Sequence, residues 1–343
     1  MATAAVLLTV VLAVVSALPT QDPVIRKLDP GPRYQHVADG EGTLHLVDMW
    51  QKASDISESA RYNADSQNIY HLFTRLNPTV SQPMLLGNTG LLGLTNYDPR
   101  RRTIVLIHGW NSGTHSPFNT VLVPAFLSAE DLNVIMVDWT AGSNTINYAA
   151  AVENTRIAGE GIARFIDWLN GVTGAVATHY HIVGHSLGAH MAGIIGRNVN
   201  GNIAYLTALE PALPGFITND HKFRANDGAY TEVIHTNAGL LGYVSDLGHV
   251  DFYPNGGTDM PGCDSAECDH ARSYYYLGES LISGGFTGRR CATYVGAMTG
   301  NCVLWGNLNM GGLVPKTGRV QIKKLSSGIF YLETNAAPPF SRG

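Results

Sequence analysis

The chain has 343 residues, of which 45% are hydrophobic and 14% are charged, and its formal net charge is −5. The charged fraction lies well below the roughly 25% of average proteins, and glycine is abundant with 38 residues, so the sequence indicates a compact globular protein. It contains no basic block or stripe, which argues against nucleic acid as a partner.

Residues 1–17 form a single apolar run that is typical of a secretory signal peptide. Val15 and Ala17 occupy the small-residue positions of a signal-peptidase site, and the run is shorter than a membrane span. No later apolar stretch reaches the length of a span either. The sequence therefore predicts a secreted, extracellular protein without a transmembrane segment.

Residues 18–55 contain proline, aspartate and glycine with little periodicity, and we expect a propeptide or an N-terminal arm there. Residues 56–343 show neither an internal repeat nor a linker, which favours one domain. The predicted elements, in chain order, are a strand at 69–75, a strand at 102–110, a helix at 118–129, a strand at 133–139, a helix at 147–169, a strand at 182–183, a helix at 189–196, and strands at 203–209, 230–236 and 248–253. This alternation predicts an α/β fold whose mostly parallel sheet has helices on both faces, with few helices after residue 211.

The sequence between the strand at 182–183 and the following helix reads Gly184-His185-Ser186-Leu187-Gly188. A G-x-S-x-G motif between a strand and a helix is typical of a nucleophile elbow, whose sharp turn exposes the serine. Glycines two residues before and after the serine avoid clashes in that strained turn. We therefore predict that Ser186 is a nucleophile.

A nucleophilic serine needs a histidine to accept its proton and a carboxylate to orient that histidine. In this arrangement the acid follows the serine in the chain and the histidine comes last, so the acid is expected at Glu210, directly after the strand at 203–209. The later histidines are His221, His235, His249 and His270. His270 is the best candidate for the base because it follows a loop bounded by cysteines, whereas His235 and His249 lie in predicted strands.

The negatively charged oxygen of the reaction intermediate requires two backbone N–H donors. One comes from the residue after the nucleophile, Leu187, and the other from a loop after an earlier strand. His108-Gly109-Trp110 ends the predicted strand at 102–110, so the second donor is expected to be the N–H of Trp110.

The four cysteines are Cys263, Cys268, Cys291 and Cys302, an even number that predicts disulfides in an exported chain. Pairing of Cys263 with Cys268 and of Cys291 with Cys302 is the simplest of three connectivities. A metal site that includes His270 is the alternative, although the spacings match no zinc signature.

Six motifs in order resemble the animal neutral lipases, the family of pancreatic lipase, lipoprotein lipase, sn-1 phospholipases and insect midgut lipases. They cover 108–110, 184–190, 209–212, 233–236, 248–257 and 268–273, and the resemblance runs from about residue 60 to the C-terminus. It implies a single-domain α/β-hydrolase fold. It also implies that Ser186 and His270 are the nucleophile and base, with Trp110 and Leu187 at the oxyanion hole.

The sequence departs from these relatives in four features. The family's acid is an aspartate, whereas this chain has Glu210. Only residues 264–267 separate Cys263 from Cys268, where the family has a long lid, so we expect a nearly uncovered site with little activation by interfaces. The colipase-binding β-sandwich is not found after residue 333, and the calcium loop is matched only near Asp227, so neither colipase nor a metal or other cofactor is expected.

Two functions remain open from the sequence. The first is a secreted, digestive ester hydrolase of the gut lumen, acting on phospholipids, galactolipids or acylglycerols at a lipid–water interface through a Ser-His-Glu triad. The alternative is an inactive binding or storage protein with the same fold.

Overall fold

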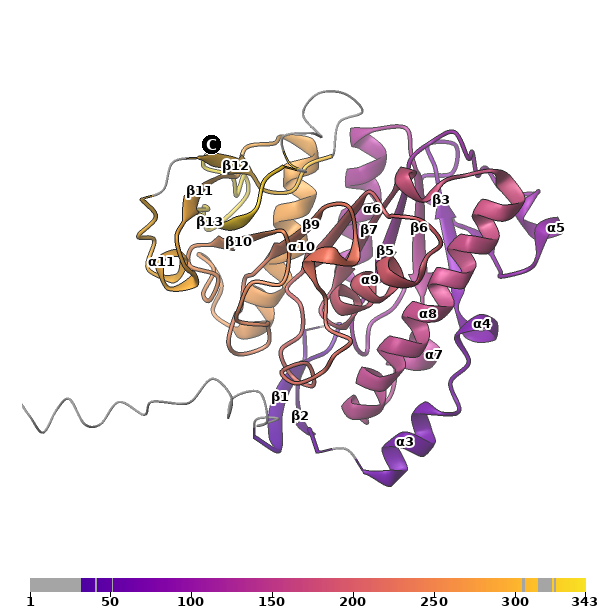
Figure 1. The fold of residues 1–343 in the computed structure, drawn as a ribbon, viewed down its shortest axis with the longest axis horizontal. Helices are drawn as coiled ribbons and strands as arrows, with labels where there is room; N and C mark the ends of the chain where they lie inside the picture. Colours follow the sequence, from indigo (N-terminus) through magenta and orange to yellow (C-terminus); the bar gives the residue numbers. More distant parts are fainter. Residues whose placement is uncertain (1–31, 41, 51, 304–305, 314–322, 324) are drawn as a thin grey trace, which may run out of the picture.

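The computed structural model describes residues 32–343, except residues 41, 51, 304–305, 314–322 and 324 (Figure 1). The predicted signal peptide, residues 1–17, lies outside the described residues. The described chain is built around one sheet of 11 strands, in the order β12-β11-β13-β10-β9-β8-β7-β5-β6-β3-β4.

The centre of this sheet is parallel and its edges are antiparallel. The parallel strands are β6 (Asn133–Asp138), β5 (Thr103–Ile107), β7 (Tyr180–His185), β8 (Tyr205–Leu209), β9 (Thr231–Ile234), β10 (Val250–Pro254) and β13 (Gly328–Leu332). The edge strands are β3 (Ile69–Phe73) and β4 (Gln82–Met84) on one side, and β11 (Thr287–Cys291) and β12 (Asn307–Asn309) on the other. The carboxyl ends of the parallel strands therefore share one edge, where sites form in α/β proteins.

Long helices cover both faces of the sheet, which confirms the predicted α/β-hydrolase fold. α8 (Tyr148–Thr173) and α9 (Leu187–Asn198) pack on one face, and α6 (Pro117–Ala129) and α10 (Ala266–Ile282) pack on the other. Strand β5 is apolar from Ile104 to Ile107 because Val105 and Ile107 enter the first core while Ile104 and Leu106 enter the second. The short helices are α3 (Ala53–Ser59), α4 (Ala64–Gln67), α5 (Thr89–Leu92), α7 (Thr140–Ser143) and α11 (Tyr294–Met298).

Two sequence predictions about helices were wrong. α8 continues past Asn170 to Thr173 and ends at Gly174, which adopts the left-handed conformation with φ of 77°. The scarcity of helices after residue 211 does not hold, because α10 has 17 residues. Its start is marked by Ser265, whose side chain accepts a hydrogen bond from the backbone of Cys268.

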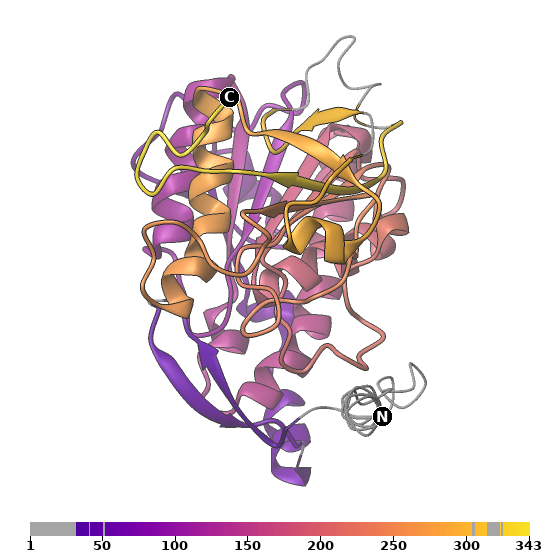
Figure 2. The same ribbon diagram turned by 90° about the vertical axis from the view of Figure 1, so that its left-hand side faces the viewer.

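The N-terminal region contains a separate two-stranded hairpin. Strand β1 (Tyr34–Ala38) pairs antiparallel with β2 (Leu44–Asp48), and neither strand joins the large sheet. Figures 1 and 2 show this indigo hairpin standing apart from the central strands. Part of the region with little sequence periodicity is therefore folded, and it contacts the domain at the site described next.

Candidate active site

Ser186 lies in a strained turn between β7 and α9, as the elbow motif predicts. Its backbone has φ of 57° and ψ of −118°, a region that non-glycine residues seldom occupy. A Cβ atom on Gly184 would lie 1.9 Å from the carbonyl oxygen of Gly188, and one on Gly188 would lie 2.3 Å from the carbonyl oxygen of Ile107. Both glycines of the motif are therefore required by steric contact.

Backbone strain gathers at the carboxyl ends of the parallel strands. Four non-glycine residues with positive φ follow such strands: Asn111 after β5, Ser186 after β7, Glu210 after β8 and Asn255 after β10. Strained residues of this kind persist where the surrounding fold holds them, and they cluster at functional sites. The pattern points to this edge of the sheet independently of the sequence motif.

Glu210 is fully buried, and its two carboxylate oxygens have different surroundings. Oε2 accepts hydrogen bonds from the backbone N–H of Thr236, from Thr236 Oγ1 at 2.7 Å and from the backbone N–H of Asn237 at 2.7 Å. Oε1 has no hydrogen-bond partner among the described residues. Burial raises the pKa of the Glu210 carboxyl to about 7, although the nearby His235 and the bonds from Thr236 and Asn237 act in the opposite direction.

The longer side chain of glutamate fits because a glycine lies beside it. A Cβ atom on Gly242 would lie only 1.3 Å from Oε1 of Glu210. Gly242 belongs to the short loop between β9 and β10, so this loop provides the space that the additional methylene of Glu210 occupies.

His270 lies in the first turns of α10, a helix that the sequence analysis did not predict. It is 4% exposed, and its Nδ1 atom has no partner among the described residues. Burial, and then the neighbouring His185, hold the pKa of His270 well below its ordinary value. The two rings lie 4.5 Å apart, and Nε2 of His185 donates to the backbone carbonyl of His270 at 3.2 Å.

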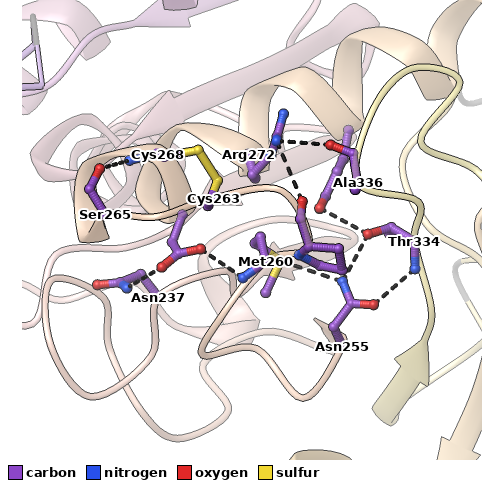
Figure 3. Close-up of a disulfide and its surroundings, with 12 residues drawn as sticks. Asn237, Asn255, Met260, Cys263, Ser265, Cys268, Arg272, Thr334 and Ala336 are labelled. Atoms are coloured by element: carbon purple, nitrogen blue, oxygen red, sulfur yellow. Dashed lines mark hydrogen bonds between the residues drawn. A yellow bond between two sulfur atoms is a disulfide. The ribbon is translucent and has the colours of Figure 1, made fainter.

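Asn237 connects the segment of Glu210 with the helix of His270, a contact that sequence reasoning missed. Its backbone N–H binds Glu210, while its side-chain amide donates to Oδ2 of Asp269, the residue before His270, at 3.4 Å. Oδ1 of Asp269 accepts from the backbone N–H of Met260 at 2.7 Å. Figure 3 shows Asn237 and Met260 beside the disulfide that precedes this helix. The only sequence signal was that Asn237 directly follows the motif at 233–236.

The expected oxyanion donors lie beside the serine. Leu187 is the first residue of α9, and Trp110 follows β5 through Gly109. A Cβ atom on Gly109 would lie 3.0 Å from Cβ of Ser186, so this turn approaches the nucleophile closely. Among the hydrogen bonds of the described residues, none engages the backbone N–H of Trp110 or of Leu187.

The other polar candidates have structural partners. Asp251 accepts a hydrogen bond from Nε2 of His235 at 2.9 Å, and it also accepts from the backbone N–H groups of Leu247 and Gly248. These bonds make Asp251 unsuited to the role of triad acid. Asp227 pairs with Arg197 at 2.6 Å. Within the described ranges, no group of three or more side chains suited to a metal ion occurs.

Both local disulfides are present, joining Cys263 to Cys268 and Cys291 to Cys302. The first closes the loop before α10 and so constrains the segment that leads to His270. Ser186 itself is 6% exposed.

The structure thus gathers Ser186, Glu210 and His270 at one edge of the sheet without linking them directly. In the part of the chain that the structure describes, no hydrogen bond joins Ser186 to His270 or His270 to Glu210. The buried Nδ1 of His270 and the buried Oε1 of Glu210 are left as an unpaired nitrogen and an unpaired acceptor. Catalytic hydrogen bonds are often long in unliganded sites and tighten only with substrate.

Comparison with known proteins gives a consistent family. The Lipase family model matches residues 47–340. Lipase member H-A of Xenopus laevis is 37% identical over 243 residues, covering 67% of this chain and 52% of that protein. Human pancreatic triacylglycerol lipase is 33% identical over 314 residues, covering 81% of this chain and 66% of that protein. The chain therefore spans about half to two thirds of the length of these relatives.

Among solved structures, the acetyl xylan esterase from Aspergillus awamori overlaps with 82% of this chain and 93% of its own, at 10% identity and a TM-score of 0.33. A TM-score this low adds nothing to the family match. Within the described residues, no helix is long and apolar enough to span a membrane.

The raised pKa of Glu210 predicts how stability depends on pH. The unfolded chain ionises this carboxyl near its ordinary 4.5 and the folded chain near 7, so its contribution to stability is present below 4.5 and lost as the pH rises to 7. Over this pH range the contribution of Glu210 to the free energy of unfolding falls by about 3 kcal/mol. We expect Glu210→Gln to gain stability relative to the wild type between pH 4.5 and pH 8, measured by chemical denaturation. A constant difference across this range would contradict the assignment.

The contact between Gly242 and Glu210 predicts a coupled pair of variants. Gly242→Ala should displace the carboxylate and slow the labelling of Ser186 by a fluorophosphonate at least about tenfold, because small displacements of catalytic groups are costly. Glu210→Asp combined with Gly242→Ala should recover part of the rate, since the shorter acid leaves room for the methyl group. Gly171→Ala, at a position with no atom within 4 Å, is the control. Equal rates for Gly242→Ala and wild type would show that the contact is irrelevant.

Proposed function

Because the chain belongs to the Lipase family, we propose that it is a secreted carboxylic-ester hydrolase that acts on lipids. The observation that carries this proposal is the geometry around Ser186. Ser186 has a strained backbone, and His270 and Glu210 each hold one buried, unpaired atom, which supports the proposal.

In the proposed mechanism, Ser186 Oγ attacks the ester carbonyl while Nε2 of His270 accepts its proton. Nδ1 of His270 donates to Oε1 of Glu210, which fixes the tautomer and stabilises the imidazolium that forms. The N–H groups of Trp110 and Leu187 stabilise the oxyanion. His270 then protonates the leaving alcohol, and water, activated by the same histidine, releases the acid from Ser186.

This step uses the ionised form of Glu210, which is present before the proton of Ser186 moves to His270. A carboxylate that is buried without a partner for one oxygen is costly to ionise, as its raised pKa reflects. A proton arriving on His270 supplies the missing positive charge next to Oε1. The charge pair therefore forms when the intermediate forms, which is when stabilisation accelerates the reaction.

The substrate class follows from the family and from the short loop at 264–267. Carboxylic esters of lipids fit the Lipase match, and the absence of a long loop between Cys263 and Cys268 leaves room for a polar head group. We therefore propose phospholipids or galactolipids ahead of triacylglycerols. Two disulfides support secretion, because such bonds persist in oxidising compartments, and the gut lumen is the proposed destination.

The rival proposal is a lipid-binding protein without catalysis. The observation in its favour is that Glu210 replaces the family's aspartate and that no hydrogen bond within the described residues joins it to His270. An intact Ser186, its strained turn and the two free backbone donors favour the enzyme.

Hydrolysis of a soluble short-chain ester separates these two proposals. The wild type should hydrolyse the ester, Ser186→Ala should fall to background, and Glu210→Gln should lower kcat by on the order of 10⁴ because His270 loses its orienting acceptor. Glu153→Gln, a change of the same kind on the surface of α8, should leave kcat unaltered. A wild-type rate no greater than that of Ser186→Ala would favour the binding protein. Unchanged kinetics in Glu210→Gln would exclude Glu210 as the triad acid.

A further inference from the structure

We propose that the hairpin formed by β1 and β2 is a cap over the catalytic cleft and that its outer face binds the lipid surface that holds the substrate. The choice of a lipid surface rests on the function proposed above. The position of the hairpin and the character of its outer face rest on contacts and exposure in the structure itself.

The tip of the hairpin touches the segments that carry the oxyanion donor and the base. The backbone N–H of Gly40 donates to the carbonyl of Asn111 at 3.2 Å, and the ring of His45 packs edge-on against Trp110 at 5.1 Å. A Cβ atom on Gly42 would lie 3.5 Å from Cβ of Glu267 in α10. The tip therefore bridges the loop after β5 and the helix that bears His270.

A cavity of about 240 Å³ lies under this tip. Its lining includes Asp39 and Gly40 from the hairpin, His185 and His270 from the candidate active site, and Phe118 from α6. The hairpin thus forms one wall of a space that reaches the catalytic histidine.

Access to the candidate site is narrow in this structure. Ser186 is 6% exposed and His270 is 4% exposed. The hairpin is the element that can leave at low cost, because its two strands pair only with each other. Lifting it breaks no hydrogen bond of the large sheet, whereas moving α10 would expose a core of aromatic side chains.

The hairpin has valines on its inner face and exposed large apolar side chains on its outer face, beside His36 and Asp48. Val37 and Val47 point inward and are buried. Tyr34, Leu44 and Leu46 are 57%, 41% and 62% exposed, as expected for the opposite face of paired strands. Trp50, just after β2, is 53% exposed.

The outer face has the side chains of a lipid-interface surface. The guanidinium of Arg33 pairs with Asp48 at 2.8 Å and lies 5.3 Å from the rings of both Tyr34 and Trp50. Aromatic rings with polar atoms together with leucines suit the boundary between lipid head groups and acyl chains. A protein partner is disfavoured because the patch is small and borders a site for lipid esters.

Binding to lipid can open the cap because the two states differ in affinity for the surface. A ligand shifts an equilibrium only by the difference between its affinities for the two states. When the hairpin is lifted, Val37 and Val47 leave the protein core and become available to the acyl region together with the outer leucines. The lipid surface therefore binds the open state more tightly and exposes Ser186 where the substrate lies.

The outer face is tested with Leu44→Ser/Leu46→Ser, two changes at exposed positions. Its control is Leu76→Ser/Leu94→Ser, at leucines that are 73% and 80% exposed outside the hairpin. Flotation with phosphatidylcholine vesicles measures binding, and hydrolysis is measured on vesicles and on a soluble short-chain ester. We expect the hairpin variant to bind vesicles at least about tenfold more weakly and to hydrolyse them more slowly, with an unaltered rate on the soluble ester.

Equal vesicle binding by the hairpin variant and its control would overturn the proposal. Vesicle binding does not need catalysis, so this comparison stands apart from the function proposed above. If the wild type bound vesicles through the hairpin but hydrolysed no ester, the proposed enzymatic function would be rejected. The proposal that the hairpin binds lipid would still hold.

The movement is tested by a cross-link between the tip and α10. The Cβ separation at Gly42 and Glu267 lies within the range of disulfides, so Gly42→Cys/Glu267→Cys should form one on oxidation. We expect the oxidised protein to hydrolyse vesicles at least about tenfold more slowly than the same protein after mild reduction. Gly42→Cys alone is the control, because φ at this position is +85° and any side chain there is strained. Equal rates in the two redox states would show that the hairpin does not need to move, and failure to form the bond would contradict the contact.

Discussion

The buried carboxylate of Glu210 is the constraint on which the candidate site depends. One oxygen is held by three hydrogen bonds from Thr236 and Asn237, so the position of the acid is fixed by the end of β9. The other oxygen lacks a partner, which makes ionisation costly until a positive charge arrives. The arrangement therefore favours the Glu210 carboxylate most when His270 carries the proton of Ser186.

The same carboxylate explains features of the surrounding loops. Gly242 is a glycine because the glutamate oxygen occupies the space of its side chain, and the loop between β9 and β10 is close enough to line that space. Asn237 couples this loop to Asp269 and so to the helix of the base. The residues around Glu210 therefore accommodate the longer side chain of glutamate. Such accommodation is expected if the glutamate is functional, and it is not expected if activity had been lost.

Much of this fold was predictable because its signals are local. The apolar runs of β5 and β6 and the glycines around Ser186 are dictated by burial on two faces and by steric contact in one turn. The helix that bears His270 was missed because its buried residues mix polar side chains, such as Asp269 and Ser273, with few aliphatic ones. The partners of Glu210 and the hairpin over the site depend on contacts between distant segments, such as Gly40 with Asn111, which no sequence pattern encodes.

The account is tested most directly by a crystal structure of the protein with Ser186 modified by a fluorophosphonate. The adduct places a negative oxygen at the oxyanion hole and should draw the charged form of His270 toward its acid. The account predicts that Nδ1 of His270 lies about 2.6–3.2 Å from Oε1 of Glu210. A serine that does not react, or a His270 bonded to another carboxylate such as Asp251, would contradict it.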